Sequence, residues 1–383
     1  MKLLSIEPTP SPNSMKLNLD IKLPPGQRYT YTTKQLEQAP EPLRSLLQIE
    51  GVRSVFRTAD FIALDRKSTA DWQPILEQTR QLLAGDSGAA QGAGAAGQED
   101  TAYGEAQVLV QMYRGIPMQI RVRIGDSESR SALPEQFAAA VQEAAGSGMI
   151  RERMLEDLGV RYGEPEEIMT EVVNELAAAY TAERLRELIE AAKAQGSAAP
   201  VEGTAPPRPA PLSADELAQR LILPDWKDRY AAMERVSPGA EFLPLLAQAL
   251  GDENASIRRL AVVYLGDLRI PEAMPHLFTA LKDRSPSVRR TAGDTLSDLG
   301  DPAAIGPMIE SLEDSNKLVR WRAARYLYEI GDDSALEALR KAAQDEEFEI
   351  RLQAQIALER IERGEEAAGS VWQQMTASRR NEG

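Results

Sequence analysis

A repeat in the C-terminal half constrains this chain more than any other feature of its sequence. Four aspartates recur at one constant interval, and an arginine follows each of them six positions later. Apolar and alanine positions between them recur at the same interval. Agreement of so many positions at a period of about 31 residues is typical of a helical solenoid. The repeated charged residues are Asp252, Arg258, Asp283, Arg289, Asp314, Arg320, Asp345 and Arg351.

Each repeat carries the pattern of a helix with one apolar face. Ile257, Ala261, Leu265 and Leu268 fall at i, i+4, i+8 and i+11, and a turn and a second helix follow. One such unit cannot bury its own apolar face, so we expect the core to be shared between neighbouring repeats. The segment 225–250 fits as an earlier repeat that is two residues shorter.

These repeats resemble HEAT repeats of the short kind found in phycobilisome-lyase-like proteins, over residues 225–361. The resemblance implies the fold and says little about function. One enzymatic HEAT family, deoxyhypusine hydroxylase, holds a di-iron centre with His-Glu pairs. This chain has only His276, which we expect at the surface, and so lacks that pattern.

The repeated arginines admit two interpretations. They form a row that grips an acidic partner, or they pair with the repeated aspartates and link adjacent repeats. We favour the second, structural interpretation, because it explains both columns and because arginine suits paired, hydrogen-bonded sites. Trp321, Tyr326 and Tyr328 are the better candidates for a surface that faces a partner.

Two segments of linker composition divide the chain. Residues 85–101 are rich in Gly and Ala and predict a flexible linker, and residues 195–213 are rich in Pro and Ala and predict a stiffer one. The predicted domains are therefore 1–84, 102–194 and 214–362, followed by a polar tail at 363–383.

The first domain predicts the element order β-α-β-β-α. Met15, Leu17 and Leu19 alternate with polar residues, which indicates a half-buried strand. Residues 23–30 predict a turn, 39–52 a helix, 52–66 two short strands and 71–83 a second helix. Prolines at 8, 10 and 12 precede the first strand, where they stiffen the chain and oppose a helix.

The motifs "TPSPNSMKL", "LRSLLQIEGVRSVF", "DFIAL" and "DW" make this domain resemble the Nfu/NifU N-terminal domain. In that family a separate C-terminal domain carries the Cys-x-x-Cys pair that binds the cluster, and it is missing here. The resemblance therefore implies the accessory fold without cluster chemistry. Asn13, Met15 and Lys16 are candidates for a docking surface, although a purely structural start of the strand is the favoured interpretation.

The middle domain predicts a β-hairpin over 106–125, with Arg114 and Gly115 at its turn. Helices are expected over 134–148, 149–159, 165–181 and 182–195. Arg121 and Arg123 are interpreted as part of a solvated sheet face in preference to an anion site. This domain shows no catalytic constellation.

The composition opposes several kinds of function. The chain has 383 residues, 44 Lys and Arg, 59 Asp and Glu, and a formal net charge of −15, which disfavours nucleic acid and anionic membranes as partners. It has no cysteine, so it cannot supply thiolates to an iron–sulfur cluster or a zinc site, and no cofactor or metal is expected. We find neither a secretion signal nor a membrane span, and we expect a cytoplasmic protein.

The whole arrangement resembles the conserved virulence factor C family of Gram-positive bacteria. The expected fold class is α+β for the N-terminal and middle domains, followed by an all-α HEAT-repeat solenoid. The resemblance implies a non-catalytic protein linked to virulence regulation, and we expect an adaptor for protein partners of unknown identity. A second hypothesis is an accessory factor in iron–sulfur cluster assembly that docks cluster carriers. An enzyme is the least favoured hypothesis.

Overall fold

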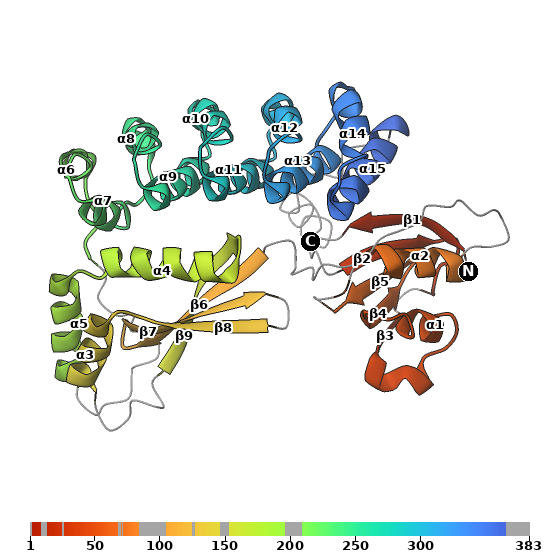
Figure 1. Ribbon diagram of the computed structural model, residues 1–383, viewed down its shortest axis with the longest axis horizontal. Helices are drawn as coiled ribbons and strands as arrows, with labels where there is room; N and C mark the ends of the chain where they lie inside the picture. Colours follow the sequence, from red (N-terminus) through yellow and green to blue (C-terminus); the bar gives the residue numbers. More distant parts are fainter. Residues whose placement is uncertain are drawn as a thin grey trace. The chain divides into compact units, whose positions relative to one another are not determined.

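The computed structural model describes residues 2–8, 14–24, 27–67, 70, 72–83, 105–124, 127–145, 153–195 and 209–364. The chain forms two compact units (Figure 1). Unit 1 contains residues 1–103 and 312–383, and unit 2 contains residues 104–311. The last repeats therefore belong to the same unit as the N-terminal domain, and the earlier repeats to the same unit as the middle domain.

The N-terminal domain in unit 1 is an antiparallel sheet of five strands with two α-helices. Its strands are β1 (Leu3–Pro8), β2 (Ser14–Leu19), β3 (Arg28–Thr32), β4 (Val52–Thr58) and β5 (Phe61–Arg66), in the order β1-β2-β5-β4-β3. Its helices are α1 (Leu43–Leu47), α2 (Trp72–Leu83) and the 3₁₀ helix η1 (Thr33–Gln38). Leu17, Ile62 and Leu64 alternate with more exposed neighbours and lie fully buried in its core.

Several predictions for this domain are confirmed, and others are wrong in detail. Strand β2, the hairpin β4–β5 and helix α2 lie where the sequence places them. Strand β3 covers the end of the predicted turn and continues to Thr32, because it pairs with β4, more than 20 residues later in the chain. Strand β1, which pairs with β2, was not predicted. The predicted helix 39–52 is reduced to α1, since Pro40 and Pro42 precede it and Gly51, with φ of 91°, follows it. Asn13 and two of the three prolines, Pro10 and Pro12, lie outside the described residues.

The middle domain in unit 2 is a four-stranded antiparallel sheet with three helices. The strands are β6 (Glu105–Tyr113), β7 (Ile116–Ile124), β8 (Ser127–Ala132) and β9 (Arg153–Tyr162), in the order β8-β7-β6-β9. The helices are α3 (Glu135–Ala144), α4 (Pro165–Ala179) and α5 (Ala182–Gln195). The predicted hairpin is confirmed: Arg114 and Gly115 both have positive φ, 48° and 82°, as a tight turn between twisted strands requires.

The predicted helix 149–159 is wrong, because residues 153–162 form strand β9. This strand pairs with β6 along its whole length, from Arg153 opposite Tyr113 to Tyr162 opposite Glu105. The run of charged residues has good local helix propensity, but pairing with β6, about 50 residues away in sequence, overrides it. Strand β8, which extends the sheet beyond β7, was also not predicted.

The C-terminal half is helical throughout its described part. Unit 2 contains α6 (Ala214–Arg220), α7 (Trp226–Met233), α8 (Leu243–Ala249), α9 (Ala255–Leu268), α10 (Met274–Ala280), α11 (Pro286–Leu299) and α12 (Ile305–Ser311). Unit 1 contains α13 (Lys317–Glu329), α14 (Leu336–Ala342) and α15 (Phe348–Glu362). Short 3₁₀ turns join the helices of each pair: η3 (Ala240–Phe242), η4 (Pro271–Ala273), η5 (Pro302–Ala304) and η6 (Asp333–Ala335). The predicted fold class is confirmed.

A column of alanines allows the longer helices of the repeats to approach one another. Helix α9 packs along α11 in unit 2, and α13 packs along α15 in unit 1. Ala261, Ala292, Ala323 and Ala354 are all fully buried, each flanked by the buried apolar residues of its own helix. A larger side chain at these positions has no space at normal packing density.

We expect Ala292→Leu to destabilise unit 2 by about 1–3 kcal/mol, because overpacking forces neighbouring side chains out of their preferred rotamers. The matched control is Ala138→Leu on the exposed side of α3, where the change is about 0.5 kcal/mol or less. Urea titrations of the full chain followed by circular dichroism measure both. Equal midpoints for the two variants would contradict the shared-core arrangement.

Candidate functional site

One column of the repeat varies in residue type, although the arginine column before it stays constant. It comes directly after the repeated arginines, one residue further along each helix. Its members follow the constant interval of the repeat, except that the first stands two positions closer to the second, because its repeat is shorter. We call these residues the docking column: Tyr230, Arg259, Arg290, Trp321 and Leu352.

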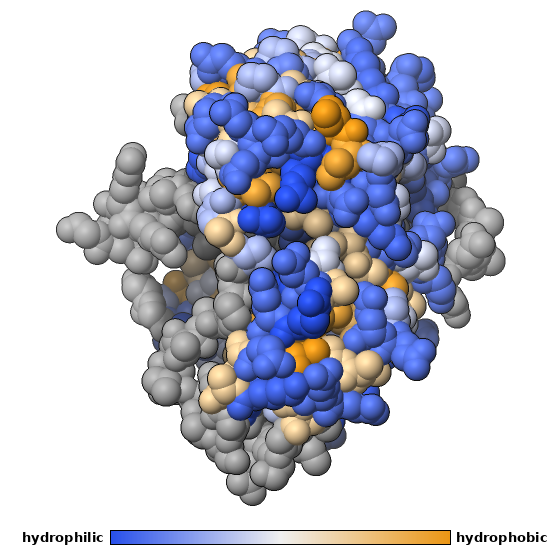
Figure 2. Space-filling model, turned by 90° about the vertical axis from the view of Figure 1, so that its left-hand side faces the viewer, coloured by the Kyte–Doolittle hydropathy of each residue, from blue (hydrophilic) through white to orange (hydrophobic). Residues whose placement is uncertain are grey.

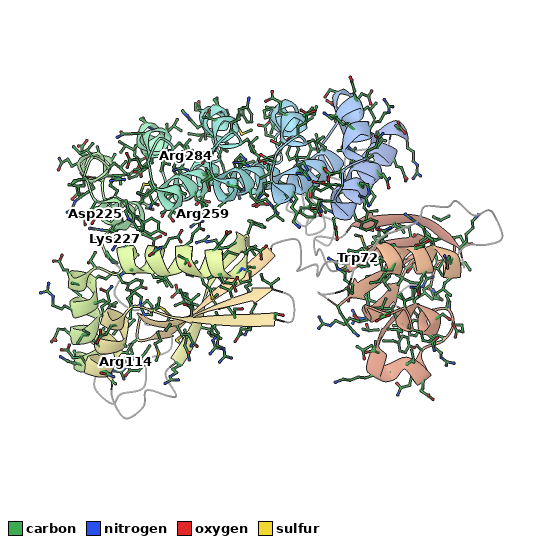
Figure 3. The ribbon with its side chains drawn as sticks, in the orientation of Figure 1. Trp72, Arg114, Asp225, Lys227, Arg259 and Arg284 are labelled. Atoms are coloured by element: carbon green, nitrogen blue, oxygen red, sulfur yellow. The ribbon has the colours of Figure 1, made fainter. Side chains whose placement is uncertain are left out.

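In unit 2 the docking column binds the middle domain through a buried ion cluster. Nη2 of Arg259 on α9 donates to both carboxylate oxygens of Glu175 on α4, at 3.1 and 3.3 Å. Arg161 on β9 donates to the same carboxylate at 3.1 Å. Arg259 lies on the side of α9 that faces α4 (Figure 3). The carboxylate of Glu175 therefore connects the middle domain to the repeats.

The protonation of this cluster follows from its surroundings. Burial alone would raise the pKa of Glu175, but the positive charges of Arg259 and Arg161 and a hydrogen bond from Ser256 outweigh it and lower the pKa below its usual 4.5. Glu171, one helical turn earlier, shows the opposite shift. Its pKa is raised by burial and by the negative charge of Glu175. Glu175 is thus held ionised, whereas Glu171 is disfavoured as an anion.

Two further members of the docking column lie at the same interface between the middle domain and the repeats. We call this interface, and the one between the N-terminal domain and α15, the joints. The guanidinium of Arg290 on α11 stacks over the ring of Tyr162 at the end of β9, 3.8 Å from its centroid. Tyr230 on α7 is buried, and burial together with the charges of Glu175 and Glu234 raises the pKa of its hydroxyl. Helix α4 also packs against α7. The middle domain therefore contacts the first helices of three neighbouring repeats, α7, α9 and α11.

In unit 1 the docking column binds the N-terminal domain through apolar packing. Leu352 on α15 is 7% exposed and belongs to the hydrophobic core of that domain. Phe348 and Ile356, one turn on either side of it, pack against the same core. Beside them, the buried Arg66 of β5 lies 3.9 Å from the carboxylate of Glu349 and stacks on Trp72. Helix α15 thus completes the core of the N-terminal domain.

The repeated charges form cross-repeat pairs within each unit. Arg258 donates to both oxygens of Asp283, at 2.7 and 2.9 Å, and to the carbonyl oxygens of Asp252 and Glu253. Arg320 pairs with Asp345 in the same way. Arg289 and Arg351 donate to the carbonyl oxygens of Asp283 and Asp345. Asp314 accepts from the backbone of Asn316.

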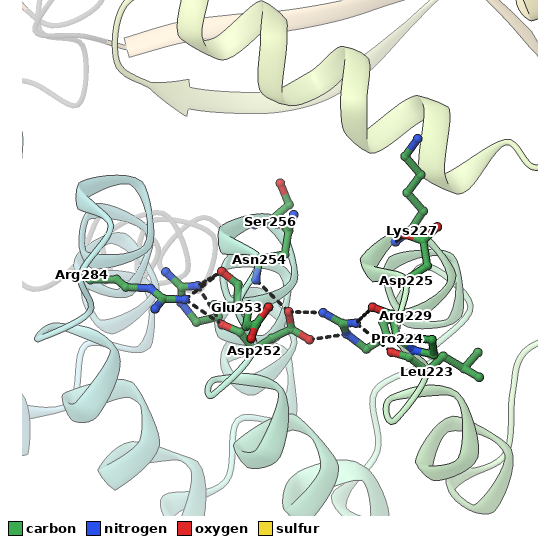
Figure 4. Close-up of polar contacts among 11 residues, drawn as sticks. Leu223, Pro224, Asp225, Lys227, Arg229, Asp252, Glu253, Asn254, Ser256 and Arg284 are labelled. Atoms are coloured by element: carbon green, nitrogen blue, oxygen red, sulfur yellow. Dashed lines mark hydrogen bonds and ion pairs between the residues drawn. The ribbon is translucent and has the colours of Figure 1, made fainter.

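A further pair lies one repeat earlier than the sequence comparison placed the ladder. Arg229 donates to both oxygens of Asp252, at 2.7 and 2.9 Å, as Figure 4 shows. The same figure shows Arg284 reaching the carbonyl oxygen of Glu253, at 2.8 Å. Arg229 was missed because its repeat is shorter than the others, which moves it out of the constant spacing.

The candidate partner residues do not form one surface. Tyr326 is fully buried, so its proposed role in facing a partner is wrong: its helix position points into the core. Trp321 and Tyr328 are half-buried, and Arg325 lies 5.4 Å from the ring centroid of Tyr328. The single histidine, His276, is half-buried and not fully exposed as expected.

The N-terminal candidates are also separated by the structure. Met15 is buried in the core, so it is not available to a partner, whereas Lys16 points to the opposite face, with Nζ 5.3 Å from the ring centroid of Phe61. Asn13 lies outside the described residues.

Apart from Trp321, the docking column was missed because the sequence comparison followed only positions that repeat. A position that changes from Tyr to Arg to Trp to Leu directly after a constant arginine was itself a signal. The side chains of such a column contact different residues in different repeats.

The described residues contain neither a metal-binding group nor a membrane-spanning helix. No three His, Asp or Glu side chains there are grouped as metal ligands. In the same part of the chain, no helix is both long enough and apolar enough to cross a membrane. Hydrophilic side chains cover most of the face drawn in Figure 2, and its visible apolar side chains lie in small groups.

The fold and the docking column define a class: a HEAT-repeat protein whose repeat helices bind two smaller α+β domains of the same chain. Family models match accordingly, "Scaffold protein Nfu/NifU N terminal" at residues 4–87, "Virulence factor" at 111–189 and "HEAT repeats" at 243–315 and 305–381. Over 98% of its length, the chain is 45% identical to Conserved virulence factor C of Staphylococcus aureus (strain MRSA252), covering 99% of that protein. The chain belongs to the conserved virulence factor C family.

The chain is also similar to two further proteins. Uncharacterized protein YpgR of Bacillus subtilis (strain 168) is 53% identical over 99% of both chains. The crystal structure of protein SAV1430 from Staphylococcus aureus is 32% identical, and the match covers 22% of this chain and all of that one, with a TM-score of 0.21.

The buried Glu175 and the half-buried Glu171 should respond to substitution in opposite directions. Glu175→Gln leaves two arginines without their counter-charge, and we expect a loss of about 3–5 kcal/mol at pH 7. Because its folded pKa is lowered, the contribution of Glu175 is present above pH 4.5 and is lost as the pH falls below it, so this difference shrinks in acid. Glu171→Gln should instead stabilise the protein at pH 7, and that gain should vanish in acid, because the folded pKa of Glu171 is raised.

Urea titrations at pH 7, 5 and 3.5, with hydrogen exchange of α4 and α9, measure both effects. Destabilisation of similar size and pH dependence by both variants would contradict the assigned charges.

The cross-repeat ladder predicts a second contrast. Arg258→Ala removes the partner of a nearly buried carboxylate, and we expect a loss of about 3–5 kcal/mol. The matched control is Arg284→Ala, whose exposed side chain contacts the same loop and should cost less than about 1 kcal/mol. Thermal and urea unfolding of the full chain compare them, and equal losses would mean that the ladder does not link the repeats.

Proposed function

We propose that this chain is a non-catalytic scaffold: its repeat helices hold two small α+β domains, and protein partners bind to the assembled chain. The docking column carries this proposal. Each of its contacts is specialised for one occupant, with arginines meeting Glu175 and Tyr162 and with Leu352 entering an apolar core. HEAT repeats suit such a role, because stacked helices give an extended surface for other protein elements.

The ionisable groups at the joint support a structural role over catalysis. Glu175 is saturated by two arginines and buried between elements, so it lacks the free volume and the open coordination that a reacting group needs. The name of the Staphylococcus relatives, Conserved virulence factor C, connects the family with virulence. We therefore propose that the scaffold takes part in the regulation of virulence in pathogens.

A second function, accessory work in iron–sulfur cluster assembly, is favoured by one observation, the match of residues 4–87 to the N-terminal domain of the scaffold protein Nfu/NifU. Because the chain has no cysteine, it would act by docking cluster carriers. In a deletion strain grown with limiting iron, this function predicts a decrease in iron–sulfur enzyme activities. Unchanged activities would contradict it.

The scaffold function predicts that partners depend on the joints. A tagged chain expressed from its chromosomal locus should recover a reproducible set of proteins after crosslinking, as identified by mass spectrometry. Leu352→Asp, which places a charge in the N-terminal core, should reduce recovery of at least one of them several-fold, whereas Arg284→Ala should leave the set unchanged. A set no different from that of the tag alone would overturn the proposal.

A further inference from the structure

The sheet of the middle domain has two different faces. Residues that pair directly across antiparallel strands share a face. Arg161, opposite Ala106, reaches Glu175 of α4, so α4 covers the face to which the buried Val108 and Val110 belong. The opposite face carries polar and charged side chains from all four strands. We call its charged and exposed apolar part the arginine face: Arg121, Arg123, Glu128, Arg130, Leu155, Asp157 and Val160.

Three arginines of this face surround one carboxylate. Nε of Arg123 and Nε of Arg130 donate to the two oxygens of Glu128, at 2.7 and 2.8 Å. Arg121 lies 3.7 Å from Glu128, and its hydrogen bond to Gln111 is long at 3.4 Å. Arg123 and Arg130 remain 43% and 57% exposed. One carboxylate cannot neutralise three guanidinium groups, so this cluster keeps a net charge of +2 on a chain whose net charge is −15.

The other end of the same face is apolar. Leu155 and Val160 on β9 are 48% and 47% exposed, and they flank Asp157 on this face. In the central row, Arg130, Arg121, Leu109 and Asp157 follow one another from β8 to β9. With strands about 4.8 Å apart, this row spans about 14 Å, the length of four or five extended residues.

We propose that the arginine face binds a short acidic segment of a protein partner, with carboxylates on Arg121, Arg123 and Arg130 and an apolar side chain on Leu155 and Val160. Carboxylates suit this surface because arginine binds them in a planar, bidentate manner and three guanidinium groups converge there. Glu128 occupies the site as an internal competitor. The proposal rests on the scaffold function and names the class of partner that the middle domain presents.

Charge complementarity favours an acidic peptide over single-stranded nucleic acid. Binding of single strands combines a basic groove with aromatic side chains on which bases stack. The paired residues of this face from Gln107 to Gln111, and their partners on the other strands, include no aromatic side chain.

A phage-displayed library of random dodecapeptides, selected on the full chain, tests the proposal without a known partner. We expect enriched peptides to carry two or more acidic residues followed by a large apolar residue. Synthetic, fluorescently labelled forms of these peptides should bind the full chain in anisotropy titrations. A higher salt concentration should weaken this binding. A fluorescent deoxythymidine dodecamer serves as the nucleic-acid probe.

Three variants of the full chain decide where the peptides bind. The substitutions Arg121→Gln, Arg123→Gln and Arg130→Gln together should weaken binding at least tenfold. Arg186→Gln, Arg220→Gln and Lys227→Gln, which remove the same charge from exposed positions of unit 2, should change it less than twofold. Glu128→Gln should tighten binding about threefold or more, because it removes the competing carboxylate. This increase keeps the test decisive even if the triple variant folds poorly.

Three results would overturn the arginine face as the binding surface. In the first, the enriched peptides carry no acidic residues. In the second, the triple variant and its charge-matched control bind the peptides equally well. In the third, the chain binds the deoxythymidine dodecamer, and only the triple variant loses this binding. If peptides bind elsewhere while crosslinked partners still depend on Leu352, the arginine face fails and the scaffold function stands. If neither experiment yields a specific partner, both fail.

Discussion

The first helix of each repeat has to bury two faces, and the rest of the structure depends on this requirement. We call these helices the repeat row. One face meets the neighbouring helix of the row, as α9 meets α11 and α13 meets α15. On α7, α9, α11 and α15 the adjoining face, which carries the docking column, meets another domain of the same chain. A helix with only one buried face would leave Leu352 or the paired charge of Arg259 in water, where they contribute little.

This double burial explains the pattern of the sequence. Positions that meet a neighbouring repeat stay constant because the neighbour is nearly identical, as the alanine column and the Asp–Arg ladder show. Positions in the docking column differ because their occupants differ: a carboxylate for Arg259, an aromatic ring for Arg290 and an apolar core for Leu352. The constant interval therefore predicted the solenoid and gave no indication of what binds to it. Strand β9 shows the same limit, because its pairing with β6 is a property of distant residues, whereas its own residues favour a helix.

The two joints use different physical means to hold a domain. Apolar packing around Leu352 contributes mainly through the burial of area and tolerates small changes of angle. The cluster of Glu175, Arg161 and Arg259 contributes less net free energy, because burial of the charges offsets their attraction, but misplacement of one charge is costly. It therefore fixes the position of α4 on the repeat row more strictly. Sequence reasoning found neither joint, since each brings together residues that are distant in sequence, such as Glu175 and Arg259, which are 84 positions apart.

Strand β9 also bears on how this protein avoids associating with itself. Of the described strands, β9 pairs only with β6, so its outer edge has backbone donors and acceptors that a strand from another copy would satisfy. Three charged side chains, Arg153, Glu156 and Asp157, are exposed along it, and Gly159, with φ of 81°, interrupts its pairing register. Charge and a local bulge are the usual protection of such an edge, and here they keep an exposed strand from templating fibres or chain-to-chain sheets.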